Sequence, residues 1–251
     1  MGSGIISVEC SGTKGEGGVI VRYLGGKSRI KHDIAEYINA NSDHNQPLIS
    51  LFCGSCAVES LLDFDVKILN DLHPHLIAMW HDLQNERNFP DVITTDEYVK
   101  IKDSQNEDMG LAGFVGFGCS YGGKWWGGLA REHRGDDFCK TPKASLMKDF
   151  EGVKTATFLC GDYREVEIPD NAVVYSDPPY KNVTGYATGA FDTDGFWEYM
   201  REISKRANVF ISEESAPEDF VCVWEKPLRR QLDNQGGNTF MRIEKLFQYK
   251  G

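Results

Sequence analysis

Two short apolar runs, each followed by a turn and a segment with helical spacing, constrain the fold of this chain more than any other feature. Residues 48–53 form the first run, which ends at a glycine, and residues 57–62 are predicted to form a helix. Residues 66–70 form the second run, which stops at Asp71, and residues 73–88 carry apolar side chains at helical spacing. This order predicts a parallel sheet covered by helices, with ligands at the carboxyl ends of its strands.

The alternation of strands and helices stops near residue 95 and resumes near residue 155. Residues 116–128 in this interval are rich in glycine and aromatic side chains, so a regular core helix or strand is not expected there. We therefore predict one α/β domain with an insertion. Its first part is residues 1–94, the inserted subdomain is residues 95–154, and its second part is residues 155–251.

The sheet is predicted to continue after the insertion. Residues 157–160 and 172–175 are apolar runs, and each is followed within two residues by an acid. Both strands therefore end in an acid at the edge where the sheet is expected to bind ligands. A helix, a strand and a closing hairpin are predicted at residues 196–207, at residues 208–212, and at residues 220–226 with 239–248.

The composition indicates a globular protein without a membrane span. The 251 residues are 41% hydrophobic and include 14 Phe, 10 Tyr and 5 Trp, which is ample for a packed core. No apolar run approaches the ~20 residues that cross a bilayer, and the polar start does not resemble a signal peptide. We expect a location in the cytoplasm or in the interior of a host cell, and we favour a monomer.

Seven cysteines, an odd number in a chain of this size, are typical of a reducing compartment. Cys53 and Cys56 form the pattern C-x-x-C, for which a redox or zinc role is the alternative to two small residues at a turn. We favour the turn and expect no metal site, because there is no second C-x-x-C and no histidine pair spaced for a tetrahedral site. His73 and His75, at a helix start, are expected to be solvated.

The net charge of −11 counts against nucleic-acid binding, because a DNA-binding surface neutralises phosphates with Lys and Arg. The distribution of charge matters more than the sum. Residues 22–31 contain four basic residues and no acid, and residues 226–245 contain five basic residues against two acids. Local basic surfaces therefore remain possible, although such clusters are usually solvated faces.

The sharpest functional signal directly follows the apolar run of residues 172–175. It consists of Asp177, Pro178, Pro179 and Tyr180. Two consecutive prolines have no amide donors, so the carbonyls here remain available to accept hydrogen bonds. A carboxylate beside such carbonyls is suited to holding an amino group. The alternative is an ordinary Pro-Pro turn with a helix-capping aspartate.

Four further blocks precede this one. They are aromatic-x-Gly-Gly-Lys at residues 23–27, Phe-x-Gly-x-Cys at residues 52–56, Asn-Asp at residues 70–71 and Gly-Asp-Tyr at residues 161–163. In this order the five blocks make the chain resemble the Dam-like, alpha-group family of N6-adenine-specific DNA methyltransferases. The resemblance implies a Rossmann-like, S-adenosylmethionine-dependent methyltransferase sheet with an inserted target-recognition subdomain. It also implies methylation of adenine N6 in double-stranded DNA at a short specific sequence.

The resemblance makes the block from Asp177 to Tyr180 the catalytic centre. Asp177 and the Pro178 carbonyl accept the two N–H bonds of the adenine amine, so that its lone pair points at a sulfonium methyl group. The transfer then depends on positioning and electrostatics. Tyr180 offers a ring face on which an extruded base can stack.

Cofactor contacts follow from the same resemblance. Tyr23 and Lys27 contact the methionine end of the cofactor, and Asp71 accepts hydrogen bonds from the ribose hydroxyls. Asp162 is expected to accept from the adenine amino group while Tyr163 stacks on the ring. The complete predicted set is Tyr23, Gly25, Gly26, Lys27, Phe52, Cys53, Gly54, Ser55, Asp71, Asp162, Tyr163 and Asp177.

Two residues depart from the family pattern. Cys56 stands in place of the final glycine of its block, and cysteine does not adopt a positive φ cheaply, so the turn geometry is in question. Ser50 stands where many relatives have an acid, two residues before Phe52.

The segment of residues 116–134 resembles the target-recognition region of the family. The predicted DNA contacts are Lys124, Trp125, Trp126, Arg131 and Arg134. The basic side chains are candidates for phosphates or base edges, and the tryptophans for wedging or stacking. Aromatic residues at this density are also typical of a small satellite core, which is the alternative.

Two other functions stay open at this stage. Methyltransferases that act on cytosine N4, on RNA or on a protein amide need the same hold on an amino nitrogen. A catalytically dead DNA-binding protein of the same fold is the second alternative. Cys56 favours it, whereas the intact block at Asp177 does not.

Overall fold

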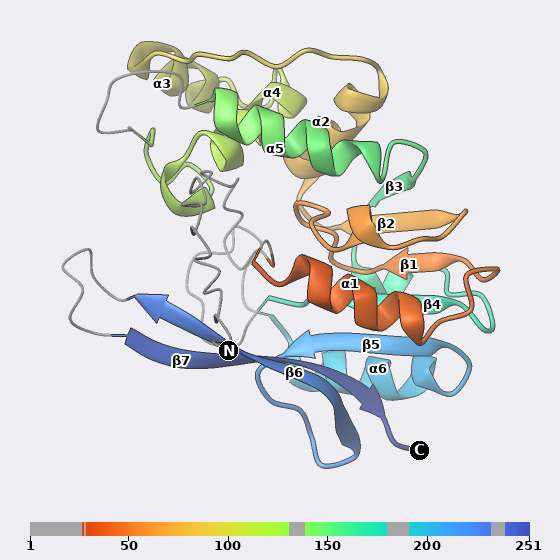
Figure 1. The fold of residues 1–251 in the computed structure, drawn as a ribbon. Helices are drawn as coiled ribbons and strands as arrows, with labels where there is room; N and C mark the ends of the chain where they lie inside the picture. Colours follow the sequence, from red (N-terminus) through yellow and green to blue (C-terminus); the bar gives the residue numbers. More distant parts are fainter. Residues whose placement is uncertain (1–26, 28, 131–138, 180–190, 232–238) are drawn as a thin grey trace, which may run out of the picture.

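The computed structural model describes residue 27 and residues 29–130, 139–179, 191–231 and 239–251, and its ribbon is drawn in Figure 1. All structural statements below concern these residues. Tyr23, Gly25, Gly26, Arg131, Arg134 and Tyr180 lie outside them.

A seven-stranded sheet forms the centre of the molecule, in the order β3-β2-β1-β4-β5-β7-β6. Its strands are β1 (Leu48–Ser50), β2 (Lys67–Asp71), β3 (Thr157–Cys160), β4 (Val173–Ser176), β5 (Asn208–Glu213), β6 (Phe220–Gln231) and β7 (Thr239–Tyr249). Strands β1 to β5 pair in parallel, whereas β7 is antiparallel to both β5 and β6. The predicted α/β class, the parallel sheet and the closing hairpin are confirmed.

The order of the strands defines one ligand-binding edge. The chain steps outward from β1 to β2 and β3, and it then resumes on the other side of β1 with β4 and β5. Open α/β sheets bind ligands outside the carboxyl ends of their strands at such a reversal. Asp71 is the last residue of β2 and Asp177 directly follows β4, so these two acids flank the reversal.

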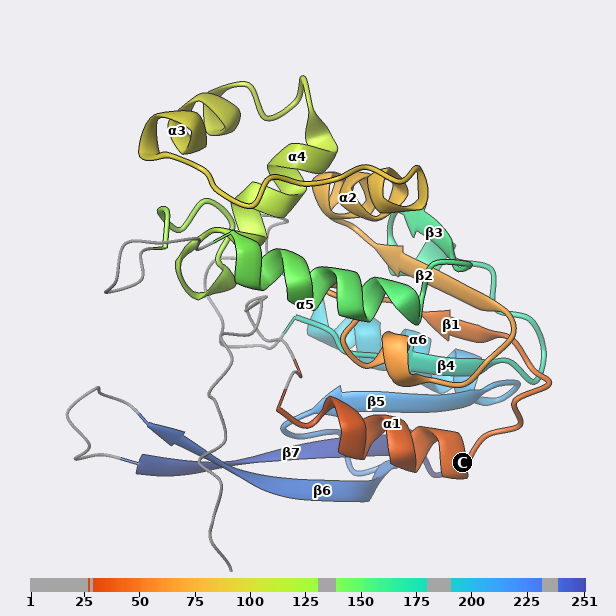
Figure 2. The same ribbon diagram turned by 45° about the horizontal axis from the view of Figure 1, so that its top comes forward.

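Helices cover both faces of the sheet, as Figure 2 shows. The helices of the described residues are α1 (Lys31–Ala40), α2 (Pro74–Gln84), α3 (Thr95–Asp103), α4 (Met109–Gly113), α5 (Lys140–Glu151) and α6 (Thr193–Ser204), and the short helical turns are η1 (Glu59–Leu61), η2 (Phe114–Gly118), η3 (Tyr121–Gly123) and η4 (Tyr163–Glu165). The helix predicted for residues 57–62 is therefore only the single turn η1.

The alternation of side chains along the strands separates two hydrophobic clusters. Val173 of β4 packs with Ile34 of α1, whereas its neighbour Val174 packs with Phe196 of α6. Consecutive residues of a strand point to opposite faces, so each face of β4 has its own helix. The sheet is thereby buried on both sides, as parallel sheets are.

A third cluster joins α2, α4, η2 and the one buried residue of β3. It includes Trp80 and Phe158, whose rings stack with centroids 5.5 Å apart. Residues 114–117 of η2 are buried within it. The expectation that residues 116–128 contain no core helix is therefore wrong at their start, because the glycines there permit close packing.

Close packing of α4 against α2 depends on Gly113. A Cβ atom at this position would lie 2.1 Å from the backbone carbonyl oxygen of His75. The residue has φ −59°, so its backbone is ordinary helix and only the missing side chain matters. Two helices can approach this closely only where one of them presents no Cβ.

We predict that Gly113→Ala destabilises the protein by about 1–3 kcal/mol, because overpacking forces α4 away from α2. The free energy of unfolding in urea measures the effect. Gly118→Ala is the matched control, since a Cβ there would meet nothing closer than 3.6 Å. Equal stabilities of the two variants would contradict the close approach of the helices.

Candidate active site at the carboxyl ends of the strands

The turn after β1 has the backbone geometry that the Phe-x-Gly-x-Cys block predicted. Gly54 and Cys56 both have φ of 50°, in the left-handed region that favours glycine. The Cys56 amide donates to the Cys53 carbonyl at 2.7 Å, and the Cys56 side chain is fully buried. Cysteine therefore keeps the turn at a conformational cost of roughly 1–2 kcal/mol, and its packing in the core offsets part of that cost.

Asp71 holds this turn against β2. Its carboxylate is buried and accepts from the backbone amides of Gly54 and His73, each at 2.9 Å. Burial raises the pKa of Asp71, although both amides favour the ionised form. The residue thus shapes the edge of the site before any ligand arrives.

Asn70 ties the same edge together and was not among the predicted site residues. Its side-chain amide donates to the carbonyl oxygen of Leu51 at 3.1 Å and to that of Gly161 at 3.0 Å. The contacts join the ends of β1, β2 and β3. A polar residue at the end of a buried strand, next to an acid, was the signal that could have identified it.

Asp177 forms an ion pair with Lys27, 150 residues away in sequence. The Lys27 ammonium donates to Asp177 Oδ1 at 2.6 Å, and Lys27 is 4% exposed. The Asp177 side chain is 19% exposed, so it reaches the surface of the edge, while Pro178 behind it is buried. The sequence predicted that Lys27 contacts the cofactor. In the structure its ammonium instead contacts the carboxylate of Asp177, the predicted catalytic residue.

Glu59 supplies a buried carboxyl group next to Ser50, the position where the sequence lacks the acid of many relatives. Ser50 Oγ donates to Glu59 Oε1 at 2.7 Å, and both residues are buried. Burial raises the pKa of Glu59 to about 8, and the hydrogen bond from Ser50 opposes that rise. Sequence inspection missed Glu59 because η1 brings it back onto β1.

The Gly-Asp-Tyr block differs from its predicted arrangement. The Asp162 carboxylate accepts hydrogen bonds from the backbone amide and from the guanidinium Nε of Arg164, each at 2.9 Å. Tyr163 is buried in the α6-facing cluster, with its ring centroid 5.1 Å from that of Phe52. The prediction that Tyr163 stacks on a ligand is therefore corrected, because its ring already packs in the core.

The tryptophans of the inserted segment are also packed. Trp125 lies against His73, with ring centroids 4.4 Å apart, and Trp126 Nε1 donates to Gln105 Oε1 at 2.8 Å. Both rings pack against the cluster around α2, which is the satellite-core alternative, whereas Lys124 is exposed. Wedging or stacking by either tryptophan would first require the ring to leave this packing.

His73 and His75 are buried rather than solvated, which corrects the expectation for them. Their rings lie 5.5 Å apart, and burial followed by the charge of His75 lowers the pKa of His73 to about 4. Within the described residues, no group of three or more His, Cys, Asp or Glu side chains could hold a metal ion.

Two exposed apolar side chains at this edge were missed from the sequence. Leu72 directly follows Asp71 and is 48% exposed, and Leu159 of β3 is 37% exposed. Their strands are neighbours, with Asn70 opposite Leu159. Apolar side chains beside a buried acid suit a ligand that combines a flat ring with hydroxyl groups.

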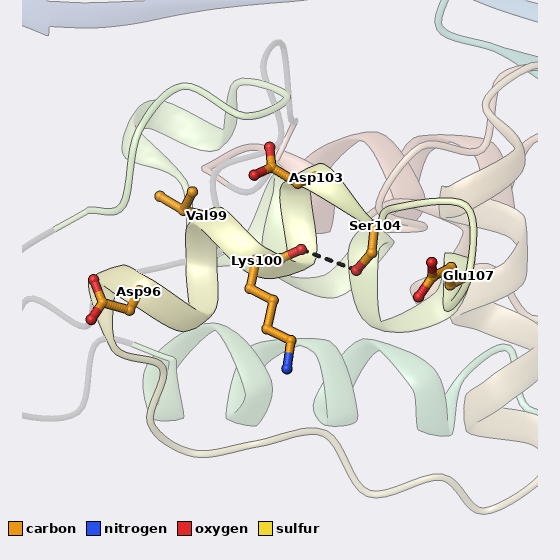
Figure 3. A pocket seen from close by; sticks show the side chains of 6 residues that line it. All are labelled: Asp96, Val99, Lys100, Asp103, Ser104 and Glu107. Carbon is orange, nitrogen blue, oxygen red and sulfur yellow. Dashed lines mark hydrogen bonds between the residues drawn. The ribbon is translucent and has the colours of Figure 1, made fainter.

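A separate hollow of about 570 Å³ lies beside α3 and away from this edge (Figure 3). It is lined by Asp96, Val99, Lys100, Asp103, Ser104 and Glu107. Three carboxylates against one ammonium disfavour phosphate binding, so we place neither cofactor nor DNA there.

Comparison with known proteins supports the predicted family. Residues 23–110 match the family model described as D12 class N6 adenine-specific DNA methyltransferase. Over these residues the chain is similar to this class of methyltransferases. The matched segment includes Lys27, Gly54 and Asp71 and ends before Asp177.

Similar proteins with known names are also DNA adenine methyltransferases. The chain is 26% identical to the DNA N-6-adenine-methyltransferase of Escherichia phage P1, over 79% of this chain and 30% of the phage protein. It is 25% identical to the DNA adenine methylase of Vibrio cholerae, over 69% of this chain and 71% of that protein. The chain thus spans less than a third of the length of the phage relative.

A solved structure of magnesium protoporphyrin IX methyltransferase from Synechocystis aligns with a TM-score of 0.37 at 8% identity, over 90% of this chain and 80% of that one. The Rossmann-like methyltransferase sheet predicted from the sequence agrees with the strand order described above.

No helix of the described residues is long and apolar enough to cross a membrane.

The pKa of Glu59 generates a pH prediction. An acid whose pKa is raised from 4.5 to about 8 on folding binds its proton more tightly in the folded state, so stability falls as pH rises between these values. Glu59→Gln cannot ionise and escapes this loss. The stability of the variant relative to wild type should rise by up to about 3 kcal/mol from pH 5.5 to 7.5, at about 1.4 kcal/mol per unit.

Urea unfolding at a series of pH values measures this difference. Glu36→Gln, at an exposed glutamate of α1, is the control and should leave the pH dependence of wild type unchanged. Parallel stability curves for wild type and Glu59→Gln would show that Glu59 ionises normally in the folded protein.

Proposed function

We propose that this protein transfers a methyl group from S-adenosylmethionine to adenine N6 in double-stranded DNA. The observation that carries the proposal is the position of Asp177. It follows β4 at the reversal of strand order, precedes two prolines and contacts the buried ammonium of Lys27. The family match and the names of the relatives support the same activity.

The edge formed by β1, β2 and β3 fits the cofactor. Gly54 has no side chain and a positive φ, so a ligand can approach the backbone closely. Leu72 and Leu159 are exposed apolar side chains that we assign to adenine, and we assign the Asp71 carboxylate to the ribose hydroxyls. Bound there, S-adenosylmethionine would supply a methyl group on a positively charged sulfur.

The residues of this chain prepare the amine and remove its proton. The Asp177 carboxylate and the Pro178 carbonyl accept the two N–H bonds of N6, which fixes the nitrogen and directs its lone pair. As the bond from N6 to the methyl carbon forms and the carbon–sulfur bond breaks, N6 must lose one proton. Asp177 is the carboxylate placed to accept it.

We predict that Asp177→Ala lowers the rate of methyl transfer on the order of 10²–10³-fold or more, because it removes the acceptor that orients the amine. Cofactor affinity should change much less. Asp170→Ala, at an aspartate whose side chain is 79% exposed, is the matched control. Nucleoside analysis of methylated DNA provides the measurement.

The same analysis separates the alternative substrates. N6-methyladenine supports the proposal, whereas N4-methylcytosine, or methylation of RNA or protein alone, contradicts it. Near wild-type transfer by Asp177→Ala would remove that residue from the mechanism.

We further propose that residues 95–154 recognise the DNA through Lys124, Arg131 and Arg134. Lys124 is exposed in a glycine-rich segment that follows η3, where its ammonium can reach a phosphate. The remaining proposals are that the protein acts as a monomer in the cytoplasm and needs no metal ion.

If one of these basic residues contacts a phosphate, its alanine variant should bind all DNA sequences more weakly. The salt dependence of binding should then flatten by about one unit of slope. One that reads a base edge should cost ~1–3 kcal/mol at a single position. Binding titrations at several salt concentrations distinguish these outcomes for the Lys124, Arg131 and Arg134 variants. Lys205→Ala, at an exposed lysine paired with Glu202 and outside this segment, is the control.

If the three variants bind and methylate like the control, recognition lies elsewhere. The basic residues at 22–31 and 226–245 would then be the next candidates.

A further inference from the structure

Lys27 lies between two carboxylates that come from distant parts of the chain. Its ammonium is 2.6 Å from Asp177 Oδ1 and 3.8 Å from Glu244 Oε2. Lys27 and Glu244 are each 4% exposed. Glu244 belongs to β7, at the antiparallel side of the sheet, and none of the sequence blocks included it.

A buried ammonium needs a negative partner close by, because its desolvation costs several kcal/mol. In the free protein the nearer of the two partners is Asp177. The proposed reaction needs that same carboxylate to accept N–H bonds from the target amine. As long as Lys27 sits on Asp177, it competes with the amine for the negative charge.

We propose that Glu244 is a positioning residue that holds the Lys27 ammonium when the target amine engages Asp177. This inference rests on the proposed function. A small rotation of the lysine side chain exchanges the closer partner, so the ammonium stays compensated throughout. Asp177 is thereby released to bind the amine without leaving a buried charge unpaired.

Other charged groups around the pair are consistent with this role. Burial raises the pKa of Glu213, on the neighbouring strand β5, to about 7, and the nearby Asp177 adds to that rise while Lys27 opposes it. Lys226, opposite Glu244 on β6, is paired with Asp33 of α1 at 2.6 Å. Measurements at pH 8 keep Glu213 largely ionised.

The kinetic test compares three single variants at pH 8. Glu244→Gln should lower kcat on the order of 10²-fold, because Lys27 then stays on Asp177 and the amine is misplaced. KM for DNA should change little. Glu244→Asp keeps the charge and should recover most of kcat, and Glu225→Gln, at an exposed glutamate of β6, should match wild type.

A thermal unfolding cycle tests the pair without any catalysis. Glu244→Gln should lower Tm in the wild-type background, where it removes a partner of Lys27. In a Lys27→Met background the same change should lower Tm by less, because the ion pair with Lys27 is already absent there.

The kinetic and the thermal measurements together distinguish a failure of the proposed function from a failure of the positioning role. If neither wild type nor any variant methylates DNA but the loss of Tm is smaller in the Lys27→Met background, the proposed function fails and the pairing stands. If wild type methylates DNA, any one of three results overturns the positioning role. These are an unchanged kcat in Glu244→Gln, a Glu244→Asp variant as slow as Glu244→Gln, and a loss of Tm of equal size in both backgrounds.

Discussion

The carboxylate of Asp71, with the amide of Asn70 beside it, is the constraint on which the rest of the site depends. Asp71 fixes the turn after β1 through Gly54, and Asn70 fixes the end of β1 and the segment after β3. Both side chains are buried, so their hydrogen bonds are formed in a setting where an unmade bond is expensive. The carboxyl ends of three strands are therefore held in one geometry before a ligand binds.

The parts of the fold that follow from local chemistry could be predicted from the sequence. An apolar run that ends at an acid marked the ends of β2 at Asp71 and of β4 before Asp177, whereas the run that ends at Gly54 continues past β1, which stops at Ser50. Contacts between distant segments could not be predicted in this way. The ion pair of Lys27 with Asp177 spans 150 residues, and no local pattern records which cation a buried carboxylate meets.

The glycine-rich segment shows a second limit of sequence reasoning. Glycine at high density usually indicates a loop, yet Gly113 and Gly116 serve close contact within a helical core. A Cβ on Gly116 would lie 2.4 Å from the Trp125 ring, so the glycine makes the place into which the tryptophan packs. A glycine-rich composition fits both a loop and a closely packed helical segment. Only the surface against which the segment packs distinguishes the two.

Part of the formal charge of −11 comes from buried carboxyl groups rather than from the exposed surface. Glu59 and Glu244 are two such groups. Burial raises the pKa of Glu59 to about 8 and that of Glu213 to about 7, so part of the formal charge is absent near neutral pH. The negative charge carried near neutral pH is therefore smaller than the sequence count implies.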